Sequence, residues 1–122
     1  MVAGFYDMQC VPADHPMRDV AYHLMISTDA SQLARREEAY VAHYVSALNA
    51  LRPDCELTFD EAWVEYRLHA LFALSTCIIC AGTSDLILGK VMATLTLGRV
   101  CAAMDRVDSR GALELVLAKR KT

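Results

Sequence analysis

A run of twelve residues without a charged side chain, Ala70 to Ala81, constrains the fold of this chain more than any other feature. It continues an amphipathic helical pattern that begins near Phe59 and is apolar nearly all round. A helix without a polar face must be surrounded by other helices or covered by a partner. The run is shorter than the roughly 18 to 20 residues that cross a bilayer. We therefore expect a central helix over 59–81 and no membrane partner.

Four further helices are predicted around it from apolar spacing and capping residues. The first extends from about Pro16 to Ile26, and the second begins after Thr28 or Asp29 and ends at Arg52-Pro53-Asp54. Thr58 and Glu61 have the spacing of a capping box for the helix over 59–81. The fourth is capped by Thr83, Ser84 or Asp85 and ends near Asp105, and the last extends from Ala112 to Lys119 after a cap at Asp108-Ser109.

Each long helix has a predicted packing stripe. In the second helix it comprises Leu33, Tyr40, Val41, Tyr44, Val45, Leu48 and Leu51. The early part of the third packs through Ala62, Trp63, Tyr66 and Ala70, and the fourth carries Leu88, Val91, Met92, Leu95 and Val100. The third and fourth helices are predicted to form a buried helical hairpin.

The N-terminal stretch has a different pattern. Val2, Phe5 and Tyr6 favour a short β-strand or hairpin that ends at Asp7. Prolines then interrupt the chain until Pro16, which suits a first helical turn. Asp19 is therefore expected near the start of a helix. From spacing alone, Asp7 is a turn aspartate or a metal ligand, and Asp19 is a carboxylate favoured by the helix dipole.

Two short motifs, Asp7-Met8-Gln9 and Pro16-Met17-Arg18-Asp19-Val20-Ala21, resemble a segment of the aminoglycoside phosphotransferase-like kinases, including choline- and ecdysteroid-kinase-like members. The resemblance covers roughly residues 2 to 107 and implies the C-terminal, large-lobe portion of a protein-kinase-like fold. It implies that Asp7 binds Mg²⁺ and that Asp19 braces the catalytic loop. Met8 departs from the aromatic residue that is usual in the family, and His15 from a common glycine.

The same resemblance implies a reaction for an intact relative, namely transfer of the γ-phosphoryl group of ATP, with Mg²⁺, to a hydroxyl of a small-molecule substrate. The nucleotide-binding lysine and the His-x-Asp-x-x-x-x-Asn catalytic loop of the family would precede Met1, and this chain does not contain them. We therefore expect that the isolated chain does not catalyse transfer, because too few cooperating groups are present.

Composition limits the remaining possibilities. The 122 residues fit one domain, and 55% of them are hydrophobic, above the roughly 45 to 50% of soluble domains. Some apolar surface is therefore expected to meet a partner. A net charge of −3 with scattered basic residues argues against nucleic acid. The five cysteines are an odd number, and no signal peptide is visible, which favours reduced thiols in the cytoplasm.

Three other groups of residues have alternative interpretations. Cys77-x-x-Cys80 lies inside an apolar helix and is interpreted as two core thiols rather than a redox or metal motif. The four histidines, His15, His23, His43 and His69, have no metal-ligand spacing. Helical spacing favours packing for Tyr22, Tyr40, Tyr44, Trp63 and Tyr66, although aromatic residues can also line a pocket for a cationic ligand.

Together these patterns predict a mainly α fold in residues 1–122, with a short N-terminal strand or hairpin, about five helices, and the character of a single partial domain. A membrane-associated helical hairpin is disfavoured by Lys90, Arg99 and His69 within or beside the apolar runs. Two other functions remain open. One is a truncated member or fragment of a small-molecule kinase that partners its missing N-terminal part. The other is a helical interaction module that dimerises through the apolar third and fourth helices.

Overall fold

The computed structural model describes residues 13–83 and 89–120, which form five helices. They are α1 (Met17–Ser27), α2 (Ala30–Leu51), α3 (Phe59–Gly82), α4 (Lys90–Arg106) and α5 (Ser109–Lys119). The mainly α prediction is confirmed. No strand occurs in these two stretches, and the strand predicted to end at Asp7 lies outside the described residues.

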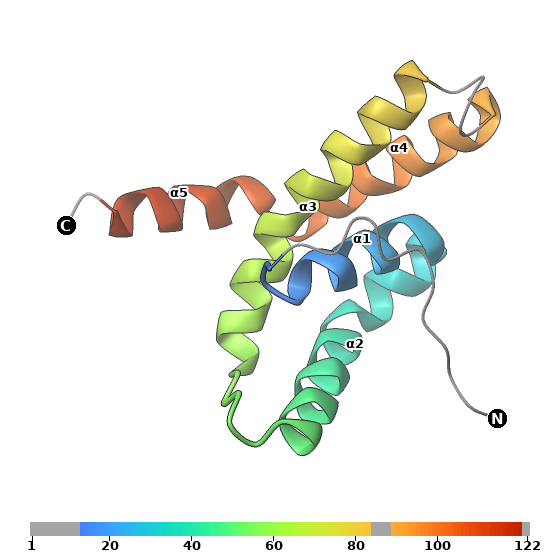
Figure 1. Cartoon of the computed structure of the whole chain (residues 1–122). Coiled ribbons are helices and arrows are strands. Elements are labelled where there is room, and N and C mark those ends of the chain that lie inside the picture. The colour runs from blue at the N-terminus through green and yellow to red at the C-terminus, as the bar shows by residue number, and fades with distance from the viewer. Residues whose placement is uncertain (1–12, 84–88, 121–122) are drawn as a thin grey trace, which may run out of the picture.

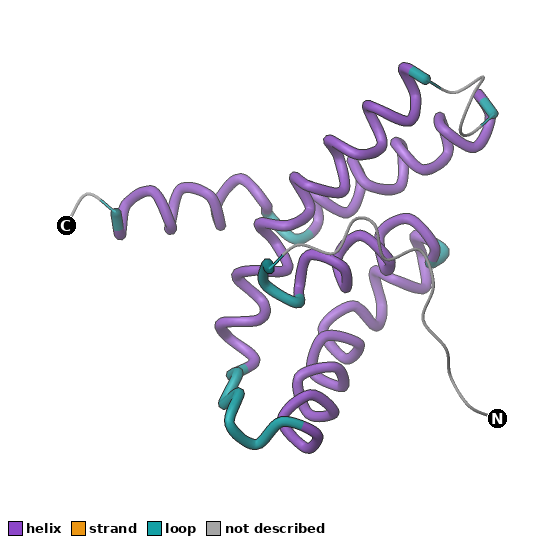
Figure 2. Tube along the Cα trace, viewed as in Figure 1, coloured by secondary structure: helices purple, strands orange, loops and turns teal. Residues whose placement is uncertain are grey.

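Helix α3 is the axis of the molecule and contacts every other helix (Figure 1). Its first half faces α2 across a connecting loop, and its second half runs beside α4 (Figure 2). Helix α1 crosses its middle, and α5 projects away to the side as an arm. The charge-free run therefore does form part of a central helix, as its composition predicts.

The helix starts follow from their capping residues. The Asp29 side chain accepts hydrogen bonds from the backbone of Ser31 and Gln32, at 3.0 and 3.1 Å, and so caps α2. The capping box of α3 is confirmed: Thr58 Oγ1 accepts from the Glu61 backbone at 3.3 Å, and Glu61 accepts from the Thr58 backbone at 3.0 Å. These side chains bind backbone donors that have no partner within the helix.

Two predicted boundaries are wrong. Thr83 does not cap the fourth helix but ends α3, where its backbone N–H and its hydroxyl both donate to the carbonyl of Ile79. The other two predicted caps, Ser84 and Asp85, lie outside the described residues. Within the described residues α4 begins at Lys90, with Gly89 at the cap position. Helix α5 begins at Ser109, three residues before the predicted start, because Asp108 is the cap and accepts from the Gly111 backbone.

Small residues let α1 lie close to α3. Met17, Ala21 and Met25 of α1 are fully buried, and so are Ala70 and Ala73 of α3. Alanine side chains bring the two helix backbones together and leave room for the longer methionines, which adapt their shape to irregular gaps. Helix α1 is therefore firmly seated on the core.

The distal half of the α3–α4 hairpin is not buried, contrary to the prediction. Val91, Met92 and Leu95 of α4 are about half exposed or more, as are Ile78 and Ile79 of α3. Of the predicted stripe, Val100 is buried and Leu88 lies outside the described residues. The rest of the buried face of α4 consists of the smaller Ala93, Thr96 and Ala103. Helix α4 packs through its small side chains and presents larger apolar ones to solvent.

Helix α3 has the length and apolar composition of a membrane span, although the charge-free run alone does not. It contains 24 residues. Of its most apolar stretch of 18 residues, 22% is buried inside the molecule. A core helix passes the same test of length and composition. This helix is packed against α1 in its middle and exposed toward its C-terminal end.

Candidate functional site

Asp19 lies in the first turn of α1, and its side chain is 85% exposed. Arg18 Nε lies 3.5 Å from the Asp19 carboxylate, while the Arg18 guanidinium also packs over the Phe72 ring, 4.6 Å from the ring centroid. The fully buried Met17 and Ala21 lie two residues before and two residues after Asp19. A rigid helix thus holds an accessible carboxylate. Asp7, the predicted Mg²⁺ ligand, lies outside the described residues.

A groove of about 610 Å³ lies beside Asp19, between α1 and α2. Its walls are formed by Pro16, Asp19, Val20, His23, Leu24, Tyr40, His43, Tyr44 and Ala47. Burial raises the pKa of the Tyr44 hydroxyl, and the nearby Asp19 carboxylate adds to this effect. The groove therefore brings Asp19 together with two of the four histidines, His23 and His43, and with the aromatic residues Tyr40 and Tyr44.

The other two histidines lie together at a second site. The rings of His15 and His69 stack with centroids 6.2 Å apart, and His69 Nε2 lies 3.8 Å from Asp14 Oδ1. Because His69 Nδ1 lies 2.8 Å from the Glu65 carbonyl oxygen, this nitrogen carries the proton in the neutral ring. Desolvation lowers the pKa of His15.

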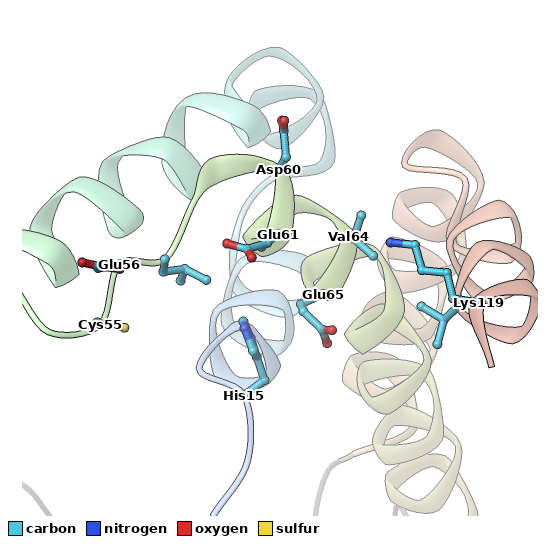
Figure 3. A pocket seen from close by; sticks show the side chains of 10 residues that line it. His15, Cys55, Glu56, Asp60, Glu61, Val64, Glu65 and Lys119 are labelled. Carbon is cyan, nitrogen blue, oxygen red and sulfur yellow. The ribbon is translucent and has the colours of Figure 1, made fainter. Parts of the chain in front are cut away.

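His15 also borders an acidic pocket of about 630 Å³ (Figure 3). The carboxylates of Glu56, Asp60, Glu61 and Glu65 and the amine of Lys119 complete its polar lining. Glu61 is already bound to Thr58 in the capping box, which lowers the Glu61 pKa. Across the described part of the chain, no group of three or more His, Cys, Asp or Glu side chains could hold a metal ion.

Glu37 is a buried charge that sequence reasoning missed. It is 5% exposed and accepts hydrogen bonds from the Tyr66 hydroxyl at 2.7 Å and from Arg106 at 2.9 and 3.0 Å. The three side chains join α2, α3 and α4. Glu37 falls four residues after Leu33 and four before Val41, so its place in the α2 stripe was a signal that could have identified it.

Within residues 13–83 and 89–120, Cys77 and Cys80 belong to no group of three or more metal-binding side chains. Cys77 is buried and Cys80 is partly exposed, so the prediction of two core thiols is correct for Cys77 and partly so for Cys80. Burial raises the pKa of the Cys77 thiol, which keeps it protonated and unreactive. Cys55 and Cys101 are exposed.

No family model, curated protein or solved structure matches this chain. The arrangement around Asp19 is thus interpreted from its own chemistry. An exposed carboxylate at the start of a firmly packed helix can accept hydrogen bonds from the backbone donors of a loop that docks beside it.

Proposed function

We propose that this chain is the C-terminal helical part of an ATP-dependent small-molecule phosphotransferase. In this proposal Asp7 binds the Mg²⁺ that accompanies ATP, and Asp19 braces a catalytic loop supplied by residues upstream of Met1. The supporting observation is the exposure of the Asp19 carboxylate on a helix that is anchored by the fully buried Met17 and Ala21. Such a carboxylate can position a loop without moving itself.

The sequence motifs provide independent support. Asp7 lies twelve residues before Asp19, close enough along the chain for both acids to serve one loop. Hard cations that bridge nucleotide phosphates bind one or two protein carboxylates, which suits Asp7. The groove between α1 and α2 would lie on the side of α1 that carries Asp19 and would supply apolar and aromatic surface to the substrate side of the site.

The reading frame upstream of Met1 provides the first test. An in-frame His-x-Asp-x-x-x-x-Asn motif is expected there, together with a lysine in the preceding lobe. The continuous chain, supplied with Mg²⁺ and ATP, should then transfer phosphate to small-molecule hydroxyls; an aminoglycoside, choline and a hydroxysteroid serve as probes. Residues 1–122 alone should transfer none. A continuous frame without the motif would contradict the proposal.

Two variants of the continuous chain sharpen the test. Asp7→Ala should abolish transfer by removing a metal ligand, and Asp19→Asn should lower kcat strongly with little change in unfolding temperature. Asp54→Asn is the control, because Asp54 is exposed in the α2–α3 loop and pairs only with Arg52 among the described residues. Full activity in Asp7→Ala would refute the assignment of the metal ligand.

A second candidate function is that of a helical interaction module. The observation that favours it is the exposure of Ile78, Ile79, Val91 and Leu95 on the distal hairpin. Apolar patches larger than a few hundred Å² are rare on monomeric proteins and usually mark a partner.

A further inference from the structure

Helix α4 has a second apolar face on the side opposite the core. Val91, Leu95, Gly98 and Ala102 follow one another at intervals of four, three and four residues, the spacing of a coiled-coil seam. All four are exposed, Val91 by 73% and Leu95 by 50%. We call these four residues the α4 outer face. No other described helix covers it.

Gly98 is the unusual member of this face. Glycine is unfavourable in a helix interior, because it loses the most backbone freedom on folding and buries no side chain. Nothing lies within 4 Å of a Cβ built at Gly98, so packing inside the monomer does not require a glycine there. A glycine at an open position lets another backbone approach closely.

We propose that the α4 outer face binds the α4 outer face of a second copy of this chain, with the two helices antiparallel. In this register Leu95 lies opposite Gly98 of the second copy, and Val91 lies opposite Ala102. Each large side chain then meets a small one. A two-fold axis repeats both contacts, as expected for a symmetric dimer.

Charge favours the same register. Lys90 and Asp105 lie on the same side of the α4 outer face, 15 residues or roughly four helical turns apart. They are about 22 Å apart along the helix, too far to pair within one chain. Neither forms a salt bridge with any residue of the described ranges. Antiparallel pairing brings Lys90 of each copy beside Asp105 of the other.

The available surface fits a weak dimer. The outer face and the neighbouring Met92 provide on the order of a few hundred Å², less than the roughly 800 Å² per partner of a standard interface. Association in the micromolar range is therefore expected. The proposal deepens the interaction-module function and is independent of phosphotransfer, so either can fail without the other.

The first experiment measures the molecular mass of the chain in solution as its protein concentration is raised. The chain should change from monomer to dimer between about 1 and 100 μM, the range for a small interface. Gly98→Gln should weaken the dimer at least about tenfold without lowering the unfolding temperature, because the added side chain has space in the monomer but blocks Leu95 of the second copy. The control is Ala42→Gln, which adds similar bulk at an exposed position on α2.

The second experiment tests the register by charge reversal. Lys90→Glu and Asp105→Lys should each weaken the dimer, and the double variant should restore it. Restoration can arise only between chains, because the two positions are too far apart within one helix. Weakening by both single variants without restoration would overturn the antiparallel register.

Other results would overturn the proposal itself. A wild-type chain that stays monomeric at 100 μM, or a dimer unaffected by Gly98→Gln, would show that this face does not bind a second copy. A chain that stays monomeric but sediments with phosphatidylcholine vesicles would assign the distal hairpin to a lipid surface instead.

Discussion

Glu37 places a carboxylate where α2, α3 and α4 meet and where little water reaches it. Burial and the Glu37 carboxylate together raise the pKa of Tyr66, so its hydroxyl stays protonated and can donate to Glu37. The two Arg106 nitrogens bind the same carboxylate in a forked geometry. The buried Glu37 carboxylate is compatible with a stable fold only while Tyr66 and Arg106 bind it, because an unpaired buried charge raises the free energy of the folded state.

Removing the Glu37 partners should therefore destabilise the fold unequally. Tyr66→Phe should lower the free energy of unfolding by about 1.5–3 kcal/mol, the range for a hydrogen bond to a charged group. Arg106→Met should cost about 3 kcal/mol, near the lower end for a broken buried pair because the Arg106 side chain is 26% exposed. Urea unfolding followed by circular dichroism measures both.

The matched control is Arg110→Met. Arg110 pairs with Glu114 on the surface of α5, where both side chains are well exposed. Exposed pairs contribute about 0–1 kcal/mol. Equal losses in Arg106→Met and Arg110→Met would mean that the Glu37 carboxylate is solvated rather than held by Arg106.

The Asp29 cap should make α2 sensitive to acid. Hydrogen bonds from the Ser31 side chain and from the Gln32 backbone lower the pKa of Asp29 below its ordinary value of 3.8. A lowered pKa means that the cap stabilises the fold fully above pH about 4 and loses this contribution as the pH falls through the folded-state pKa. Acid therefore weakens the start of α2.

Asp29→Asn isolates this effect, since asparagine also caps helices but does not titrate. The difference in unfolding free energy between wild type and variant should change between pH 5 and pH 2, with wild type losing more stability. In the wild type, Ser31→Ala should raise the Asp29 pKa measured by NMR. Parallel stability curves for wild type and Asp29→Asn would refute the role of the ionised cap.

At the scale of elements, the orientation of α5 depends on the short junction that joins it to α4. Arg67 of α3 donates to the carbonyl oxygens of Val107 and Asp108 and pairs with the Asp108 carboxylate at 2.9 Å. Asp108 adopts a left-handed conformation, with φ of 51°, and caps α5 through Gly111. The arm is therefore fixed at its base, while Leu113, Leu115 and Leu117 farther along are exposed.

Two glycines inside helices should respond in opposite ways to alanine. A Cβ at Gly111 would meet the Asp108 carboxylate, so Gly111→Ala should displace the cap, cost about 1 kcal/mol and speed amide exchange in α5. Gly98→Ala should gain about 0.5–1 kcal/mol, because its surroundings are open. Urea unfolding at low micromolar concentration measures both, and a gain in Gly111→Ala would contradict the cap.

At the scale of the whole molecule, helical periodicity was sufficient to predict the helices and the central place of α3. It placed Leu33, Val41 and Val45 in the core, where they are buried. It failed at Leu51, which is 80% exposed beside the α2–α3 loop. The spacing of apolar residues in a sequence does not show where the last turn of a helix extends past the helix on which it packs.

Helix α4 shows why side-chain size misleads such analysis. Val91, Met92 and Leu95 give the stronger apolar signal, yet Ala93, Thr96 and Ala103 are buried because the helices approach closely. The partners of Glu37 and the groove beside Asp19 depend on contacts between distant segments, which periodicity cannot supply. The exposure of Asp19 agrees with its predicted place near a helix start, while the role of Asp7 stays a prediction.

The central position of α3 also sets an order of events during synthesis. The buried face of α1 packs mainly on a helix that ends 55 residues after Ser27. At about 5–20 residues per second, a ribosome needs roughly 3 to 11 seconds to translate that interval. Until that interval is complete, Met17, Ala21 and Met25 lack the full packing surface of α3. The nascent chain therefore presents the apolar face of α1 before the rest of its core exists, and chaperones that bind apolar helices would find a target there.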